Sequence, residues 1–212
     1  FLCNPNNPTG NTIPEQILTE ILQFCASKKI RVVADECFLR FHPHYEKMSC
    51  KRFLKQYPNL LIVNAFTKFY AMAGLRLGYL MTGDLSLLHA VAQQLPEWNV
   101  SSIAQRAGIS ALQDTEYEKR TRQLIEKERR YLIQEFLKMG CTVFPSEADY
   151  ITFRLPQEKT GFLLKERLLE GKILIRSCAN YRNMPPDCYR IAVKQHADNE
   201  ELVRQVWRIL IQ

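Results

Sequence analysis

The sequence has no apolar run of the roughly 18 residues that a membrane-spanning helix needs, and no repeat or low-complexity tract. Hydrophobic residues make up 46% and charged residues 24% of the 212 positions. These fractions are close to those of globular proteins, so they exclude a disordered or fibrous chain. We therefore expect one large domain or two smaller ones, with no contact to a membrane.

The sequence also lacks a Cys-x-x-Cys pair, and its seven cysteines have no regular spacing. This favours reduced thiols in a cytoplasmic protein over a disulfide framework.

The 29 Lys and Arg residues outnumber the 22 Asp and Glu residues, for a formal net charge of +7, but they are spread along the chain. Because they are interleaved with Glu, as from Glu116 to Arg130, solvated helix surfaces are favoured over nucleic-acid binding. His42-Pro43-His44 has no nearby Cys or carboxylate to complete a metal site, so we interpret it as a surface loop and expect no metal.

Alternating strand and helix patterns predict an α/β protein. A long helix over 116–139, with an apolar stripe and Gly140 after it, separates two regions and indicates a soft boundary near residue 113. The first region, 1–113, is predicted to have strands at 30–34, 60–63 and 77–81, and helices at 14–27, 85–94 and 103–112. The second, 114–212, is predicted to be the connecting helix and a small α+β domain, with strands at 141–144, 150–154, 173–176 and 189–193, and helices at 161–169 and 199–211.

Polar residues with possible chemical roles follow the predicted strands of the first region. Asn4 to Gly10 (NPNNPTG) forms a turn of residues that restrict the backbone or permit positive φ. Asp35 and Glu36 follow the strand predicted at 30–34. Lys68 follows the strand predicted at 60–63 and lies between Thr67 and aromatic residues, a setting suited to a lysine that forms Schiff bases. Arg76 lies between Gly74 and Gly78, which allow a ligand to come close to the backbone, as binding of an anion by the arginine would require. Taken singly, each is also typical of an ordinary loop, a helix cap or a surface side chain.

Together and in this order, these segments resemble the pyridoxal-phosphate-dependent aminotransferase superfamily of fold type I. The resemblance runs from Phe1 to the end of the chain. It implies that Asn7 binds the phenolic oxygen of pyridoxal 5'-phosphate, that Asp35 pairs with the ring nitrogen, and that Thr67 and Arg76 bind the cofactor phosphate. Lys68 then carries the cofactor as a Schiff base and is the catalytic residue. The implied fold is a partial large domain, with a mostly parallel sheet and helices on both faces, plus a small C-terminal α+β domain.

Within the superfamily, the chain is most similar to the threonine-phosphate decarboxylases of cobalamin biosynthesis, with the histidinol-phosphate aminotransferases next. Residues 67–80 and 173–181 carry this similarity, and Phe38 stands three positions after Asp35, where the aminotransferases usually have Tyr. The implied reaction is decarboxylation of L-threonine O-3-phosphate to (R)-1-amino-2-propanol phosphate. The alternatives are an aminotransferase that acts on histidinol phosphate or a similar anionic amino acid, and a catalytically silent binding domain.

The resemblance implies that Asn7, Arg176 and Arg190 bind the substrate, because arginines bind carboxylate and phosphate through paired hydrogen bonds. Without the resemblance, salt bridges within the small domain explain both arginines equally well. The chain departs from the family at Ala65, where a Ser or Thr often binds phosphate, and the family's upstream phosphate-binding loop does not precede Asn4. We therefore expect a partial chain that is inactive by itself. The resemblance also implies that the complete protein is a homodimer with a shared active site.

Overall fold

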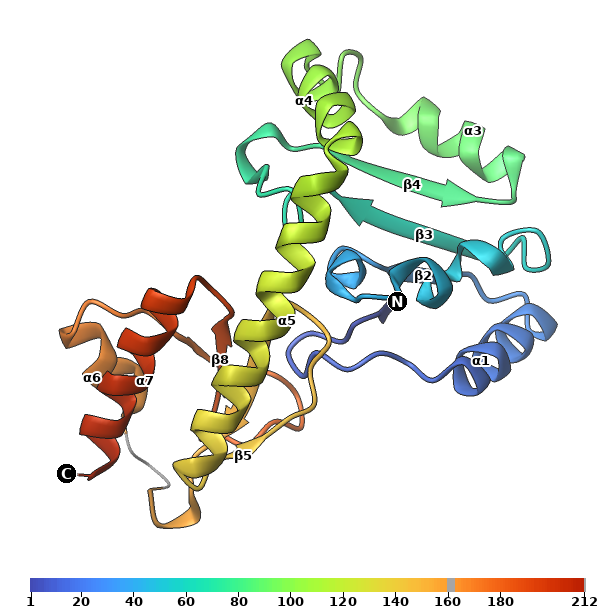
Figure 1. The fold of residues 1–212 in the computed structure, drawn as a ribbon. Helices are drawn as coiled ribbons and strands as arrows, with labels where there is room; N and C mark the ends of the chain where they lie inside the picture. Colours follow the sequence, from blue (N-terminus) through green and yellow to red (C-terminus); the bar gives the residue numbers. More distant parts are fainter. Residues whose placement is uncertain (160–162, 212) are drawn as a thin grey trace. The chain divides into compact units, whose positions relative to one another are not determined.

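The computed structural model describes residues 1–159 and 163–211, which form two compact units. The first unit contains residues 1–6 and 12–121, and the second contains residues 7–11 and the chain from Arg122 onward. The division falls inside the long helix α5 (Thr115–Lys138), shown in Figure 1. The predicted boundary near residue 113 assigned this whole helix to the C-terminal domain. The first turns of the helix belong instead to the first unit, because their side chains bond to residues 69 and 70.

The first unit is built on a four-stranded sheet in the order β1-β2-β3-β4. The first three strands are parallel, and β4 runs antiparallel to β3. The strands are β1 (Leu2–Cys3), β2 (Val32–Asp35), β3 (Leu60–Ala65) and β4 (Gly78–Thr82). The helices of this unit are α1 (Glu15–Ser27), α2 (Tyr45–Met48), α3 (Leu85–Gln94) and α4 (Ser102–Gln113).

The core of the first unit forms between α1 and the sheet. Leu18 and Leu22 are four residues apart, so they lie on one face of α1, and both are buried. They pack in one cluster with Ala34 of β2 and with Leu60 and Ile62 of β3. This packing fixes the strands whose carboxyl ends carry the predicted site residues.

The second unit has an antiparallel sheet in the order β5-β6-β8-β7. Its elements are β5 (Thr142–Val143), β6 (Tyr150–Arg154), α6 (Leu164–Glu170), β7 (Arg176–Ser177), β8 (Cys188–Ala192) and α7 (His196–Ile211). The predicted strand over 173–176 was wrong in its extent, because residues 173–175 form no strand and β7 begins at Arg176. The predicted helix over 161–169 begins at residues outside those described, and its described part starts at Leu164.

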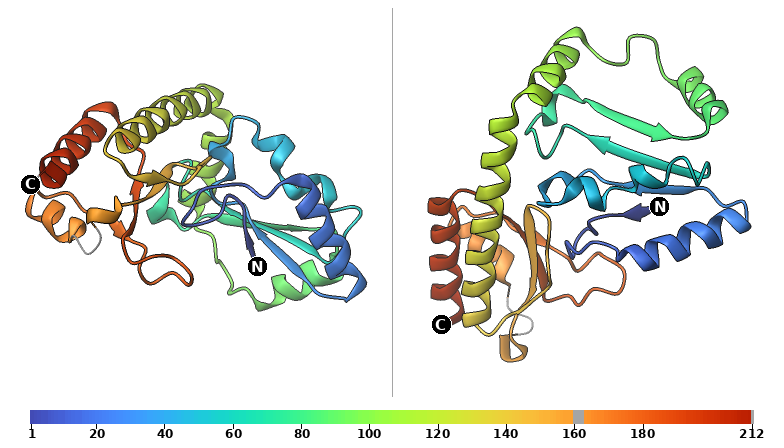
Figure 2. Two further views of the ribbon diagram at one scale, coloured as in Figure 1. Left: turned by 90° about the horizontal axis from the view of Figure 1, so that it is seen from below. Right: turned by 45° about the vertical axis from the view of Figure 1, so that its right-hand side comes forward.

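A buried carboxylate joins the second half of α5 to α7, which lie side by side in both views of Figure 2. The Glu128 side chain is fully buried, and its Oε2 accepts a hydrogen bond of 3.0 Å from Asn199 Nδ2. His196 Nδ1 lies 3.0 Å from the same oxygen. Since a buried charge is costly without partners, this contact fixes how the two helices pack.

The short segment 7–11 belongs to the second unit through contacts with its loops and β6. Gly10 accepts a backbone hydrogen bond of 2.8 Å from Glu147, and the buried Thr152 hydroxyl donates to the Pro8 carbonyl. Gly10 has a φ of +85°, and a Cβ at this position would lie 2.2 Å from Ser146 Oγ. A glycine is therefore required here for both backbone conformation and space.

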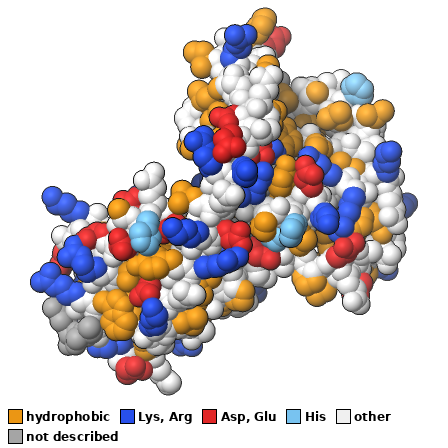
Figure 3. Space-filling view, viewed as in Figure 1, with side chains coloured by type: hydrophobic (Ala, Val, Ile, Leu, Met, Phe, Trp, Pro, Cys, Tyr) orange, Lys and Arg blue, Asp and Glu red, His pale blue; other side chains and the backbone are white. Residues whose placement is uncertain are grey.

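Charged side chains of both signs cover the surface. On the face seen in Figure 3, Lys and Arg are interspersed with Asp and Glu. Within 1–159 and 163–211, no helix is both long and apolar enough to cross a membrane. The interspersed charges on this face are typical of solvated helices.

We expect Gly10→Ala to destabilise the protein by about 1–3 kcal/mol, because the new Cβ strains the backbone and collides with Ser146. Urea denaturation measures the change. Gly74→Ala is the matched control, since a Cβ there meets nothing within 4 Å. Equal unfolding midpoints for the two variants would contradict this explanation of Gly10.

Candidate active site

Strand register brings four predicted site residues of the first unit to one edge of its sheet (Figure 1). Asp35 is the last residue of β2 and pairs with Val63 of β3. Thr67 and Lys68 follow the end of β3, and Arg76 precedes β4, whose first residue pairs with the last residue of β3. The sequence predicted that these residues follow strand ends. The antiparallel direction of β4 explains how Arg76, which precedes its strand, reaches the same edge.

Asp35 is half-buried, and its carboxylate is held by neighbouring donors. Its Oδ1 accepts a hydrogen bond of 3.0 Å from the Cys37 amide, and Cys3 Sγ lies 3.9 Å from Oδ2. Burial, together with the hydrogen bond and charge of Asp35, raises the pKa of the Cys37 thiol to about 12. The thiol beside Asp35 therefore stays neutral at physiological pH, and the carboxylate keeps a fixed orientation.

Glu36 differs from Asp35 although the two carboxylates are adjacent in sequence. Its side chain is 2% exposed and accepts hydrogen bonds from Ser49 Oγ at 2.7 Å and from the Cys50 amide at 2.6 Å. Burial raises its pKa above the ordinary value of 4.5. Glu36 thus fixes the 49–50 segment to the end of β2 and leaves Asp35 as the accessible acid of the pair.

Lys68 lies in a tight turn after β3, and its side chain is exposed. The two aromatic residues that follow it, Phe69 and Tyr70, are buried, with 2% and 9% of their surface exposed. The Lys68 ammonium lies 5.6 Å from the centroid of the Phe38 ring. The amine is therefore accessible to a ligand, beside an aromatic ring without a hydroxyl group.

The first turns of α5 hold the turn that carries Lys68. The Tyr117 hydroxyl donates to the Phe69 carbonyl at 2.9 Å, and the Tyr70 hydroxyl donates to Glu118 Oε1 at 2.6 Å. Arg40 Nε donates to the same Glu118 oxygen at 3.1 Å. The sequence analysis missed these residues, because they lie almost 50 positions or more from their partners and carry no local pattern.

Thr67 and Arg76 complete the set in the first unit. Thr67 is half-buried and Arg76 is exposed. Arg76 adopts a left-handed backbone conformation with φ of 52°, and its Nη1 donates to the Ala73 carbonyl at 3.2 Å. Since a guanidinium has five N–H donors, this one bond leaves Arg76 able to bind an anion through its others.

The second unit holds the other three predicted site residues. Arg176 of β7 and Arg190 of β8 are directly opposite each other in the strand pairing, so both side chains leave the same face of the sheet. Arg190 Nη1 donates to Asn7 Oδ1, and its guanidinium lies 5.0 Å from the centroid of the Tyr150 ring. Like charges in this arrangement repel each other, so the pair provides a strongly anion-attracting position.

Comparisons with known proteins give further findings. A family model described as aminotransferase class I and II matches residues 1–206. The threonine-phosphate decarboxylase of Salmonella typhimurium is 36% identical over 211 residues, which cover 99% of this chain and 57% of that protein. The solved histidinol-phosphate aminotransferase of Clostridium acetobutylicum is 31% identical with a TM-score of 0.92, covering 99% of this chain and 63% of that one.

A third match, at 23% identity and a TM-score of 0.85, is the histidinol-phosphate aminotransferase of Sinorhizobium meliloti, solved in complex with pyridoxal 5'-phosphate. It covers 99% of this chain and 56% of that one. These structures confirm the predicted fold type I class. The chain spans little more than half the length of the decarboxylase it matches.

We expect Tyr70→Phe to lower the free energy of unfolding by about 1.5–3 kcal/mol, because the buried Glu118 carboxylate loses a hydroxyl donor. Hydrogen exchange at the Ala71 amide, which bonds to the Lys68 carbonyl, should also become faster. Tyr57→Phe is the control, since that buried hydroxyl only accepts from Gln56 at 3.3 Å. Unchanged exchange at Ala71 would show that α5 does not hold the turn.

We also expect Glu36 to make stability depend on pH. Because its pKa is raised in the folded state, its contribution is fully present below the ordinary value of 4.5 and is lost as the pH rises through the raised value. Glu36→Gln should remove this loss, so the difference in unfolding free energy between variant and wild type should change across that window. Exposed Glu97→Gln is the control. A difference that is constant with pH would contradict the assignment.

Proposed function

The chain belongs to the aminotransferase class I and II family, whose members use pyridoxal 5'-phosphate, and we propose that the complete protein decarboxylates L-threonine O-3-phosphate. The observation that carries the proposal is the pairing of Arg176 with Arg190 on one sheet face. Two adjacent guanidiniums favour a substrate with two anionic groups. The 36% identity to a threonine-phosphate decarboxylase supports this choice of substrate.

The residues at the sheet edge of the first unit have the functional groups that the cofactor requires, and their side chains are partly or fully exposed, so a ligand can reach them. A half-buried carboxylate with a fixed orientation, Asp35, suits the ring nitrogen. The accessible amine of Lys68 would hold the cofactor, and the Thr67 hydroxyl and the Arg76 guanidinium would bind its phosphate. Ala65 offers no phosphate ligand, so these two residues supply the contacts from this segment. When bound, the cofactor accepts the electron pair left at the substrate Cα when a bond there breaks.

In the second unit, Arg176, Arg190 and Asn7 would bind and orient the substrate. Guanidiniums bind carboxylate and phosphate groups through paired hydrogen bonds, which fix the rotation of a ligand as well as its position. This orientation would decide the reaction, because the two guanidiniums and the Asn7 amide set which bond at the substrate Cα is presented for cleavage. A carboxylate presented in this way would leave as CO2.

Lys68 is then the residue that handles the proton. Once CO2 has left, the protonated Lys68 amine would deliver to Cα the proton that takes the place of the carboxylate. The Phe38 ring lies 5.6 Å from the amine, where the aminotransferases usually have a tyrosine. The absence of that hydroxyl donor beside Lys68 supports decarboxylation over amino transfer. The resulting aminopropanol phosphate is the precursor proposed for cobalamin biosynthesis.

A second candidate is an aminotransferase for histidinol phosphate or a similar substrate. The 31% identity and TM-score of 0.92 to a histidinol-phosphate aminotransferase favour it. Both candidate substrates carry a phosphate group that a guanidinium can bind, so the arginine pair alone does not separate the two reactions. Amino transfer requires a 2-oxo acid as acceptor and decarboxylation does not. A homodimer and a cytoplasmic location remain part of the proposal in either case.

The test is to incubate the full-length protein with pyridoxal 5'-phosphate and L-threonine O-3-phosphate, without any 2-oxo acid, and to measure released CO2. We expect release over many turnovers, and its loss by at least about a thousandfold in Lys68→Ala, where the proton-transferring amine is gone. Lys55→Ala, at another exposed lysine of the same unit, should be fully active. Amino transfer to 2-oxoglutarate without CO2 release would overturn the decarboxylase; no reaction of either kind would favour a binding domain.

A further inference from the structure

We propose that Tyr181 is a positioning residue that orients the Asn7 amide and also packs against Arg176. This inference rests on the proposed function, in which Asn7, Arg176 and Arg190 bind the substrate. Neither the sequence analysis nor the family resemblance assigned a role to Tyr181. Tyr181 and the three residues that would bind the substrate all belong to the second unit.

The orientation of the Asn7 amide follows from its two partners. The Tyr181 hydroxyl donates to Asn7 Oδ1 at 3.2 Å, and Arg190 Nη1 donates to the same oxygen. Because a guanidinium can only donate hydrogen bonds, the oxygen end of the amide must face Arg190. The Nδ2 end is then left to donate to a ligand oxygen. Without the Tyr181 hydroxyl, one of the two bonds that hold this orientation is lost.

The same tyrosine also contacts the second arginine. The Arg176 guanidinium lies 5.9 Å from the centroid of the Tyr181 ring, within the range of a cation–π contact. Arg176 Nη2 also donates to Asn180 Oδ1 at 3.2 Å. Asn180 and Tyr181 thus limit the orientations of an otherwise exposed arginine.

The strand pairing of the second unit explains why Tyr181 reaches both groups. It follows β7 in a turn closed by a hydrogen bond of 3.0 Å from its amide to the Cys178 carbonyl. The Cys178 amide in turn donates to the Cys188 carbonyl at 2.9 Å, which ties the turn to β8. The backbone of Tyr181 is therefore fixed to the two strands that carry Arg176 and Arg190. Tyr181 therefore contacts the Asn7 amide and the Arg176 guanidinium directly, and Asn7 in turn contacts Arg190.

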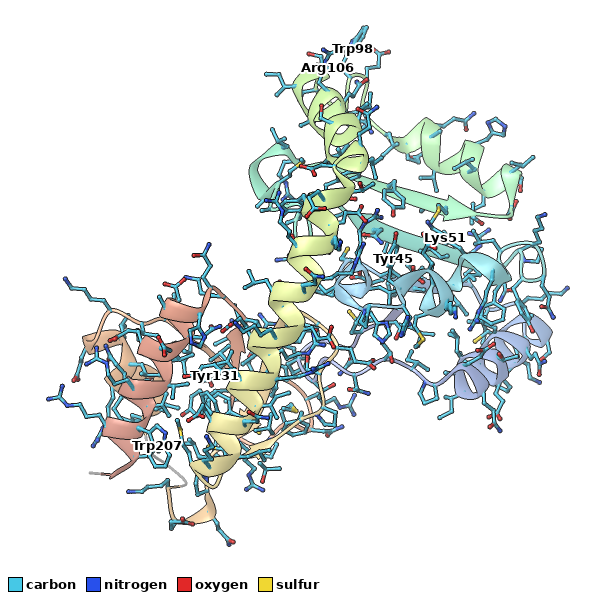
Figure 4. The ribbon with its side chains drawn as sticks, viewed as in Figure 1. Tyr45, Lys51, Trp98, Arg106, Tyr131 and Trp207 are labelled. Carbon is cyan, nitrogen blue, oxygen red and sulfur yellow. The ribbon has the colours of Figure 1, made fainter. Side chains whose placement is uncertain are left out.

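The first measurement is spectroscopic and needs no turnover. In the full-length protein labelled with 15N-asparagine, Tyr181→Phe should shift the Asn7 side-chain amide resonances and broaden them by exchange between orientations. Tyr131→Phe is the matched control, because Tyr131 lies on α5 with its ring 5.0 Å from that of His196 on α7 (Figure 4). Asn7 resonances at wild-type positions in Tyr181→Phe would overturn the proposal, whether or not the protein releases CO2.

The second measurement uses substrate kinetics. Tyr181→Phe should raise KM for L-threonine O-3-phosphate about 3- to 10-fold, the effect of one lost hydrogen bond, with kcat reduced less than KM is raised. The same change made in an Asn7→Ala background should have no further effect on KM, because Tyr181 acts through Asn7. An equal rise in both backgrounds would overturn the role of Tyr181. If the wild type does not turn over this substrate, the proposed function fails, and the Asn7 resonances alone decide the role of Tyr181.

Discussion

The buried carboxylate of Glu118 is the contact on which the geometry around Lys68 depends. It accepts hydrogen bonds from Arg40 and from Tyr70, and the adjacent Tyr117 bonds to the backbone of the same turn. Burial, with the hydrogen bond to Glu118, raises the pKa of Tyr70, so this hydroxyl stays a donor at physiological pH. These hydrogen bonds anchor the turn that carries Lys68, while the Lys68 side chain stays exposed.

In the second unit, a pair of residues that could bind an anion also destabilises the sheet. Arg176 and Arg190 stand opposite each other in the sheet, where like charges destabilise the strand pair. Their repulsion is reduced by neutral partners: aromatic rings near both guanidiniums and the Asn7 and Asn180 amides. None of these partners is a carboxylate, which would compete with an anionic ligand. The unit therefore keeps its positive charge available for a substrate.

Much of the fold was predictable because it is determined by local patterns. The spacing of Leu18 and Leu22 predicted α1, and the apolar runs ending at Asp35 and before Lys68 predicted β2 and β3. Asp35, Thr67 and Lys68 were identified in the same way, since each lies at or just after the carboxyl end of a predicted strand. The start of β7 was not predictable from the sequence. Residues 173–175 are as apolar as a strand, but they do not pair with a neighbouring strand in the structure.

The sequence by itself determined the family, the residue types of the candidate site and the order of its segments, since motifs and periodicity lie along the chain. Only the tertiary structure decided that Glu36 is buried while Asp35 is accessible, and that segment 7–11 belongs to the second unit. It also decided that Tyr181 reaches Asn7, 174 positions away. Contacts of this kind depend on strand register and helix packing, which bring together residues that no local pattern connects.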